Sequence, residues 1–132
     1  MHIPVCVAKI HRATVTQADL NYVGSITVDE ELLERSGIHP YQMVIVNNLS
    51  NGVSWRTYTI SGERHSGVIC LNGPPARHFQ PGDKVIIMAE ALIEPSEIGR
   101  LRPIVVFVDD QNRVTSVEEH SSIPSAASAL ST

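Results

Sequence analysis

The chain has 132 residues, a formal net charge of -4 at pH 7, 42% apolar residues and 5% aromatic residues. This length suits a single domain, and so few aromatic residues leave the core to aliphatic side chains. The acidic balance gives no electrostatic reason to expect nucleic acid or an anionic membrane as a partner. Because no apolar run approaches a membrane span and Lys9, His11 and Arg12 interrupt any early signal sequence, we expect a cytoplasmic protein.

The two cysteines, Cys6 and Cys70, have neither the number nor the spacing of a disulfide framework or a zinc site. Both stand in apolar runs, which predicts buried thiols in a reducing compartment. The histidines show no ligand spacing either, so we predict no metal.

The first predicted strand runs from Val5 to Val15, where the apolar residues follow strand periodicity. This alternation places Lys9 on the face opposite Ile10. Thr16, with Asp19 three residues later, resembles a capping box, so we expect a short turn there.

A short β-branched strand, residues 25–28, is predicted to lead into a short helix. Asp29 can cap the helix, which extends through Arg35, and acidic residues in its first turn suit the helix dipole. Gly37 fits the left-handed position that commonly ends a helix.

Further strands are predicted where short apolar runs alternate with turn residues. They cover residues 42–47, 54–60, 68–71, 84–89 and 104–108. Pro74 and Pro75 could open one helical turn, where a missing N–H costs little. Residues 94–102 read as a polar connection with a possible helical turn.

Many short strands with glycine and proline turns indicate a mainly β chain that folds as a small β-barrel with short helices, in one domain over residues 1–114. From Thr115 onward the sequence is rich in serine and alanine and poor in large apolar residues. Residues 115–132 are therefore predicted to form a flexible C-terminal tail.

The dipeptide Gly24-Ser25 offers unusual chemistry. Glycine lets a nucleophile approach its carbonyl carbon closely, and the hydroxyl of Ser25 stands one bond beyond that carbonyl. If the hydroxyl attacks, the amide becomes an ester, and β-elimination then releases a chain that ends at Gly24. The dehydroalanine left at position 25 hydrolyses to a pyruvoyl group. Gly-Ser is common in loops, so the dipeptide alone is weak support for self-cleavage.

Several separated motifs around this dipeptide resemble the pyruvoyl-dependent aspartate 1-decarboxylase family, from about the first residue to Phe107. The similar segments are Lys9-Ile10-His11-Arg12, Val15-Thr16-Gln17-Ala18-Asp19-Leu20, Tyr22-Val23-Gly24-Ser25, Gly37-Ile38, Asn51-Gly52, Thr57-Tyr58, Gly62-Glu63-Arg64, Leu71-Asn72-Gly73 and Gly82-Asp83.

This resemblance implies a double-psi β-barrel that assembles as a homotetramer and cleaves itself between Gly24 and Ser25. The longer fragment, residues 25–132, would carry a pyruvoyl cofactor derived from Ser25. Its carbonyl forms a Schiff base with a small amino-acid substrate and acts as an electron sink. The implied reaction converts L-aspartate into β-alanine and CO2, and the β-alanine supplies pantothenate biosynthesis.

The resemblance also implies roles for individual residues. Ser25 and Tyr58 would be catalytic, with Tyr58 delivering a proton to the substrate carbon. Thr57 would assist cleavage and line the site, and Lys9 would hold a substrate carboxylate. His11 and Tyr22 would shape the site. The loop that contacts the substrate matches Asn72, Gly73, Pro74 and Pro75.

Three departures from the family cluster around substrate recognition. The family has an arginine where Ser54 stands, a tryptophan where Asn47 stands, and alanines in place of the two prolines at positions 74 and 75. Arg56 emerges on the same strand face as Ser54, roughly 7 Å away, and could hold a substrate carboxylate instead. It could equally be a solvated surface residue.

Two alternatives to aspartate decarboxylation therefore remain open. A paralogue could decarboxylate a different small amino acid, given Ser54, Pro74 and Pro75. Less favoured is an uncleaved barrel with a binding role, because Gly24, Ser25, Thr57 and Tyr58 are all present.

Overall fold

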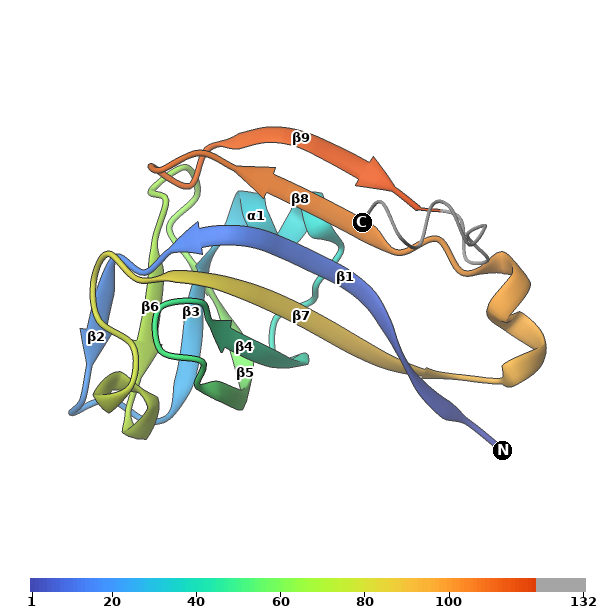
Figure 1. Cartoon of the computed structure of the whole chain (residues 1–132), viewed down its shortest axis with the longest axis horizontal. Helices are drawn as coiled ribbons and strands as arrows, with labels where there is room; N and C mark the ends of the chain where they lie inside the picture. The colour runs from blue at the N-terminus through green and yellow to red at the C-terminus, as the bar shows by residue number, and fades with distance from the viewer. Residues whose placement is uncertain (121–132) are drawn as a thin grey trace.

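Short alternating segments build most of residues 1–120, the part of the chain that the computed structural model describes (Figure 1). The strands are β1 (Ile3–Thr14), β2 (Gln17–Asp19), β3 (Ser25–Asp29), β4 (Met43–Asn48), β5 (Ser54–Gly62), β6 (Ile69–Asn72), β7 (Lys84–Ile93), β8 (Ile104–Val108) and β9 (Val114–Glu119). The helices are α1 (Glu30–Ser36) and the 3₁₀-helices η1 (Pro74–Arg77) and η2 (Pro95–Arg100).

Within residues 1–120, the strands form one sheet in the order β2-β6-β3-β5-β4-β7-β1-β8-β9, which curls on itself. Just beyond β1, the N–H of Val15 donates to the carbonyl of Asp83 at 2.9 Å, and the N–H of Thr16 donates to the carbonyl of Ile69 at 2.8 Å. The second bond brings the chain after β1 back against β6, and the first joins it to the turn before β7. The prediction of a mainly β chain folded as a small barrel with short helices is confirmed.

Aliphatic side chains fill the barrel, as the low aromatic content predicts. Ile10, Ile26, Val46 and Ile87 are fully buried, and they come from four different strands. Phe79 is the largest fully buried side chain among the described residues. The continuous core of small β-branched residues fixes the register of the strands around it.

The predicted helix caps are confirmed. The carboxylate of Asp29 accepts the N–H of Glu31 at 2.8 Å, which satisfies one of the unpaired donors of the first helical turn. Gly37 ends α1 with φ of 77°, and its N–H donates to the carbonyl groups of Leu33 and Glu34. Because β3 leads directly into α1, these caps also hold the strand that begins at Ser25.

Two predictions about local structure are wrong. Residues 17–19 form β2, which pairs with β6 in parallel, rather than a capped turn. Val114–Glu119 forms β9 on the edge of the sheet next to β8, so the tail does not begin at Thr115. Both segments are polar and exposed, and both are strands because a neighbour offers backbone partners, which composition does not reveal. The remainder of the predicted tail, residues 121–132, lies outside the described residues.

A third correction concerns Cys6, which is half-buried rather than buried. A β-bulge in β1 places Cys6 opposite Glu90 but Ala8 opposite Ala89, so the extra residue Val7 breaks the alternation. Cys6 therefore shares the outward face with Glu90, while Ala8 points into the core. Cys70 is buried as predicted, and both cysteines are free thiols.

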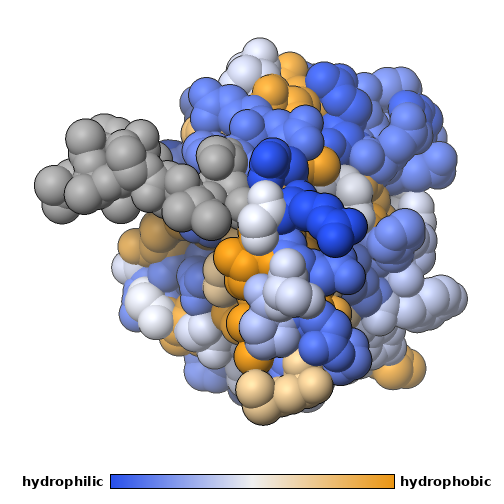
Figure 2. Space-filling view, turned by 90° about the vertical axis from the view of Figure 1, so that its right-hand side faces the viewer, coloured by the Kyte–Doolittle hydropathy of each residue, from blue (hydrophilic) through white to orange (hydrophobic). Residues whose placement is uncertain are grey.

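Apolar side chains also reach the surface at the end of the barrel where β1 begins and β7 ends. Figure 2 faces this end, and orange hydrophobic residues gather there between blue hydrophilic ones. Met1 and Leu92 are strongly exposed, as are Tyr22, Val23 and Tyr41 elsewhere on the molecule. Exposed apolar surface of this kind is typical of contacts between proteins.

Candidate active site

Ser25 lies at the first position of β3, directly after the exposed loop that follows β2. Only 1% of its surface is exposed, whereas Val23, two residues earlier, is 76% exposed. The Gly24-Ser25 peptide bond therefore marks the point where the chain enters the barrel wall. A buried serine hydroxyl needs polar partners, and β6 supplies them.

Four polar side chains form a compact block across β3 and β6. The antiparallel register pairs Ser25 with Asn72, and Thr27 with Cys70. Because the members of each strand are two residues apart, all four lie on one face. The side-chain amide nitrogen of Asn72 donates to the hydroxyl oxygens of both Ser25 and Thr27, at 2.9 Å each. We call these four residues the Asn72 block.

Gly73 brings the β6 loop against Tyr22 and Gly24. It has φ of 77°, and its N–H donates to the carbonyl of Asp19 at 2.7 Å. A Cβ at position 73 would lie 2.8 Å from the carbonyl oxygen of Tyr22 and 2.9 Å from the Cα of Gly24. Only glycine permits so close an approach. Gly24 itself has no positive φ, so the tight contact is made by Gly73.

Pro74 and Pro75 open η1 at its first two positions, as predicted. Neither has an N–H, so this part of the loop offers no backbone donors to a ligand. The N–H of Gly73 is already bonded to Asp19. The side-chain amide of Asn72 remains as a donor in this part of the loop, and its two N–H groups are directed at Ser25 and Thr27.

Thr57 and Tyr58 reach the same region from β5. This strand pairs with β3 in parallel, and Ile26 lies opposite Thr59, so the preceding residues Ser25 and Tyr58 are at matching positions. Tyr58 is half-buried and stacks on Tyr41, with ring centroids 6.3 Å apart. Thr57 is buried and points to the other side of the sheet from Tyr58.

Lys9 and His11 are not brought next to Ser25 within the described chain. Both lie on β1, which is separated from β3 by β7, β4 and β5 in the sheet. The ring of His11 meets Phe107 edge to face at 5.4 Å. Partial burial, reinforced by the positive charges of Arg12 and Lys9, lowers the pKa of His11. Lys9 lines a cavity of about 260 Å³ together with Cys6 and residues of β8.

Arg56 is held by a partner on another strand. Its guanidinium donates to a carboxylate oxygen of Glu90 at 3.0 Å, reaching across β4 to β7, and its side chain is 58% exposed. Two of the departures from the family, Ser54 and Asn47, face each other directly across β4 and β5. The structure thus places Ser54 and Asn47, two of the positions that depart from the family, on one pair of strands beside Arg56.

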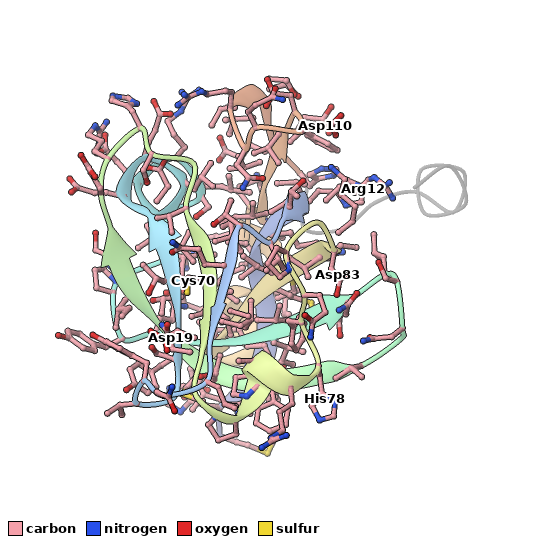
Figure 3. The ribbon with its side chains drawn as sticks, turned by 90° about the vertical axis from the view of Figure 1, so that its left-hand side faces the viewer. Arg12, Asp19, Cys70, His78, Asp83 and Asp110 are labelled. Carbon is pink, nitrogen blue, oxygen red and sulfur yellow. The ribbon has the colours of Figure 1, made fainter. Side chains whose placement is uncertain are left out.

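Sequence reasoning missed Thr27, Cys70 and Glu90. Thr27 stands two residues after Ser25, and Cys70 stands two residues before Asn72. Antiparallel pairing of residues 25–28 with residues 69–72 would have predicted that all four side chains lie together. Figure 3 shows Cys70 on β6 within the layer of strands, with Asp19 on the neighbouring β2. Glu90 could not be found this way, because the bulge in β1 and the reach of Arg56 depend on the tertiary structure.

Comparisons with known proteins fit this geometry. The family model described as aspartate decarboxylase matches residues 1–115. An aspartate 1-decarboxylase of Ruminiclostridium cellulolyticum is 56% identical over 126 residues, which covers 93% of this chain and 98% of the relative. One from Lactiplantibacillus plantarum is 57% identical and covers 87% and 88%. Another, from Clostridium acetobutylicum, is 52% identical and covers 91% and 94%.

The barrel and these matches define an enzyme that removes a carboxyl group, a decarboxylase of the lyase class. More particularly, the chain belongs to the aspartate decarboxylase family, and the resemblance seen in its motifs is confirmed. Among residues 1–120, the helices are too short or too polar to cross a membrane.

Proposed function

We propose that this decarboxylase converts L-aspartate into β-alanine and CO2, using a pyruvoyl group made from Ser25 after self-cleavage of the Gly24-Ser25 bond. The observation that carries the proposal is the hydroxyl of Ser25. It is buried directly after Gly24, and its oxygen accepts a hydrogen bond from the side-chain amide of Asn72 at 2.9 Å. A pyruvoyl carbonyl supplies an electron sink, which is what loss of a carboxylate next to an amine requires.

The residues around Ser25 fit formation of this group. The Ser25 hydroxyl oxygen attacks the Gly24 carbonyl carbon, the C–N bond breaks, and the proton passes to the new amine, giving an ester. A Cβ at Gly24 would meet nothing closer than 3.8 Å, so the Cα of this residue is not tightly crowded. Thr57, on the neighbouring β5, is the assisting group that the resemblance suggests, although its buried side chain faces the other side of the sheet from Tyr58.

Tyr58 is the proposed proton donor to the substrate α-carbon. It stands beside Ser25 in the parallel register of β3 and β5, and stacking on Tyr41 restricts its ring. A phenol positioned in this way can act as a general acid. Tyr22 and His11 are proposed to shape the site, and Gly73, Pro74 and Pro75 to form the loop that borders the substrate.

A homotetramer is proposed because one chain does not complete the site. Lys9, a cationic group proposed for a substrate carboxylate, lies on β1, which three strands separate from β3, and Arg56 on β5 is paired with Glu90. The exposed Tyr22 and Val23 beside the cleavage site offer apolar surface for a second copy. Lys9 of one copy would then serve Ser25 of another.

A second candidate substrate, a small amino acid without a side-chain carboxylate, is favoured by one observation. The Arg56 guanidinium is already paired with Glu90, and Ser54 provides no guanidinium of its own. The positive charge that Arg56 offers to the side-chain carboxylate of aspartate is thereby reduced. If aspartate is the substrate, its β-alanine would supply pantothenate synthesis. The cytoplasmic location stays a prediction.

Intact mass spectrometry of the purified protein tests self-cleavage. We expect two fragments, residues 1–24 and a pyruvoyl-blocked 25–132, whereas Ser25→Ala should remain whole and inactive because it lacks the attacking oxygen. Ser54→Ala, which alters an exposed serine, is the matched control and should still cleave. A single full-length species after prolonged incubation would favour the uncleaved binding barrel. Product analysis with aspartate and other small amino acids then identifies the substrate.

A further inference from the structure

The side-chain amide of Asn72 has two chemically different ends, and their directions matter for Ser25. The NH2 group faces two hydroxyl oxygens, those of Ser25 and Thr27. The carbonyl oxygen faces the thiol of Cys70, whose sulfur lies 3.2 Å away and donates its proton. An amide rotated by 180° would present its oxygen to Ser25 and its NH2 to sulfur, which is a weak acceptor.

The proton on the Cys70 thiol therefore favours one of these two orientations. Burial raises the pKa of Cys70, and the nearby carboxylate of Asp19 raises it further, so the sulfur keeps its proton at neutral pH. An S–H group has a proton to offer to an amide oxygen. Cys70 is also held rigidly, since it lies in β6 with Thr27 as its cross-strand neighbour.

The Ser25 hydroxyl is compatible with this arrangement. Its own proton is directed toward the carbonyl of Val23, at 3.5 Å, while its oxygen accepts from Asn72 at 2.9 Å. Thr27 completes the arrangement by accepting the second N–H of the amide. Every polar atom of the Asn72 amide thus has a partner in the Asn72 block, and these partners agree on one orientation.

We infer that Cys70 and Thr27 are positioning residues that hold the Asn72 amide with its N–H donors on the Ser25 oxygen during self-cleavage. This inference rests on the proposed self-cleavage. Neither residue touches the reacting atoms. Both act through Asn72, which does.

The step that benefits is elimination of the ester. A water or hydroxide base removes the Cα proton of Ser25, and that electron pair becomes the Cα–Cβ double bond. The Cβ–Oγ bond breaks, and its electron pair passes to the oxygen, which leaves as part of the new Gly24 carboxylate. Negative charge grows on the oxygen that Asn72 contacts, so the hydrogen bond strengthens as the reaction proceeds.

Cleavage kinetics measured by intact mass test this inference. Cys70→Ala should slow cleavage about three- to tenfold, the loss expected for one hydrogen bond, and Cys70→Ser should restore it because a hydroxyl can donate to Asn72. Thr27→Val keeps the side-chain shape, removes the acceptor and should also slow cleavage. Cys6→Ala removes the other free thiol, outside the Asn72 block, and should cleave normally.

A double-mutant cycle separates positioning from general destabilisation. In an Asn72→Ala background, Cys70→Ala should have no further effect, because the amide it orients is gone. Undiminished slowing in that background, or wild-type cleavage by both Cys70→Ala and Thr27→Val, overturns the inference.

A second readout does not depend on cleavage. In the intact Ser25→Ala chain, the two Asn72 side-chain N–H signals should be distinct and exchange slowly by NMR, and Cys70→Ala should accelerate their exchange. Unchanged exchange counts against the inference even if the wild type never cleaves. The failure of self-cleavage and the failure of the positioning role are thus distinguishable.

Discussion

The Asn72 block and the outer surface around Arg56 are built in opposite ways. In the Asn72 block, Ser25 and Asn72 are almost fully buried, and neutral hydrogen bonds between adjacent strands fix every side chain. On the outer surface, Arg56 and Glu90 form an ion pair that spans an intervening strand, and both side chains are accessible to water. Such exposed pairs contribute at most about 1 kcal/mol, whereas an unsatisfied buried polar group costs about 1–3 kcal/mol.

This difference separates the region proposed for self-cleavage from the residues proposed for substrate recognition. Changing a member of the Asn72 block leaves a buried partner unsatisfied, so its residues are strongly constrained. Changing Ser54, Asn47 or Arg56 disturbs few contacts, so recognition of a substrate carboxylate can change with little effect on the barrel. Two of the three departures from the family, Ser54 and Asn47, fall on this second, tolerant surface, whereas Pro74 and Pro75 lie in η1 beside Gly24.

Gly73→Ala should have the largest effect on self-cleavage, because its side chain would displace backbone atoms next to the buried Ser25. The new Cβ would lie under 3.0 Å from backbone atoms of Tyr22 and Gly24, on a residue with φ of 77°. We expect the loop to shift and self-cleavage to be lost, as measured by intact mass.

Gly52→Ala is the matched control for that change. Gly52 has the same φ of 77° but nothing within 4 Å of its missing Cβ, so it reports backbone strain alone. It should cost on the order of 1–3 kcal/mol of stability by thermal melting and still cleave. Equal cleavage by the two variants would show that the Gly73 contact is unimportant.

Tyr58→Phe should separate formation of the active site from its use. The phenol is not the attacking group, so the variant should cleave normally, but turnover should fall by about 10²–10⁴ through loss of the general acid. Steady-state decarboxylation by the fully cleaved variant measures this. Near-normal turnover would remove Tyr58 from the reaction.

Arg56→Ala should lower kcat/KM for aspartate by roughly 30-fold or more if substrate and a second copy exclude water from Arg56 in the assembled site, since losing a charged partner from a desolvated pair costs about 2–5 kcal/mol. Glu90→Gln should act in the opposite direction and raise kcat/KM a few-fold, because it releases the Arg56 guanidinium. Cleavage should be unaffected in both. If Arg56→Ala handles aspartate normally, the ion pair is only a surface contact.

The smallest expected effect is on pH dependence. Because burial and nearby positive charge lower the pKa of His11, the unfolded chain binds its proton more readily than the folded chain does. The stability that His11 contributes is therefore fully present above about pH 6.5. It is lost as the pH falls toward the lower pKa that His11 has in the folded chain. His11→Phe keeps a ring against Phe107. Between pH 7.5 and 5.5, its melting temperature should fall less than that of the wild type. An identical loss in both would assign the dependence to other groups.

Much of the fold follows from local sequence. Asp29 and Gly37 are recognisable helix caps, and alternation locates the strands that pack on the core. The exceptions are β2, β9 and the outward turn of Cys6. Each depends on a partner strand or a bulge, and therefore on contacts between residues that are distant in the sequence.

The candidate site divides in the same way. Ser25, Asn72, Gly73 and Pro74 are brought together, as the resemblance suggests. The orientation of the Asn72 amide and the pairing of Arg56 with Glu90 could not be predicted, because both result from side chains on different strands meeting at particular distances.

The central place of β1 has a consequence for how the finished protein comes apart. Cleavage after Gly24 would leave β1 on a separate 24-residue peptide, and this strand lies between β7 and β8 with Ile10 fully buried. The cut protein would then be a two-chain complex whose melting temperature rises with concentration. Under the proposed self-cleavage, folding would precede the cut, since only the intact chain delivers β1 by a unimolecular route. Once denatured, the mature protein would have to reassemble by collision of its fragments.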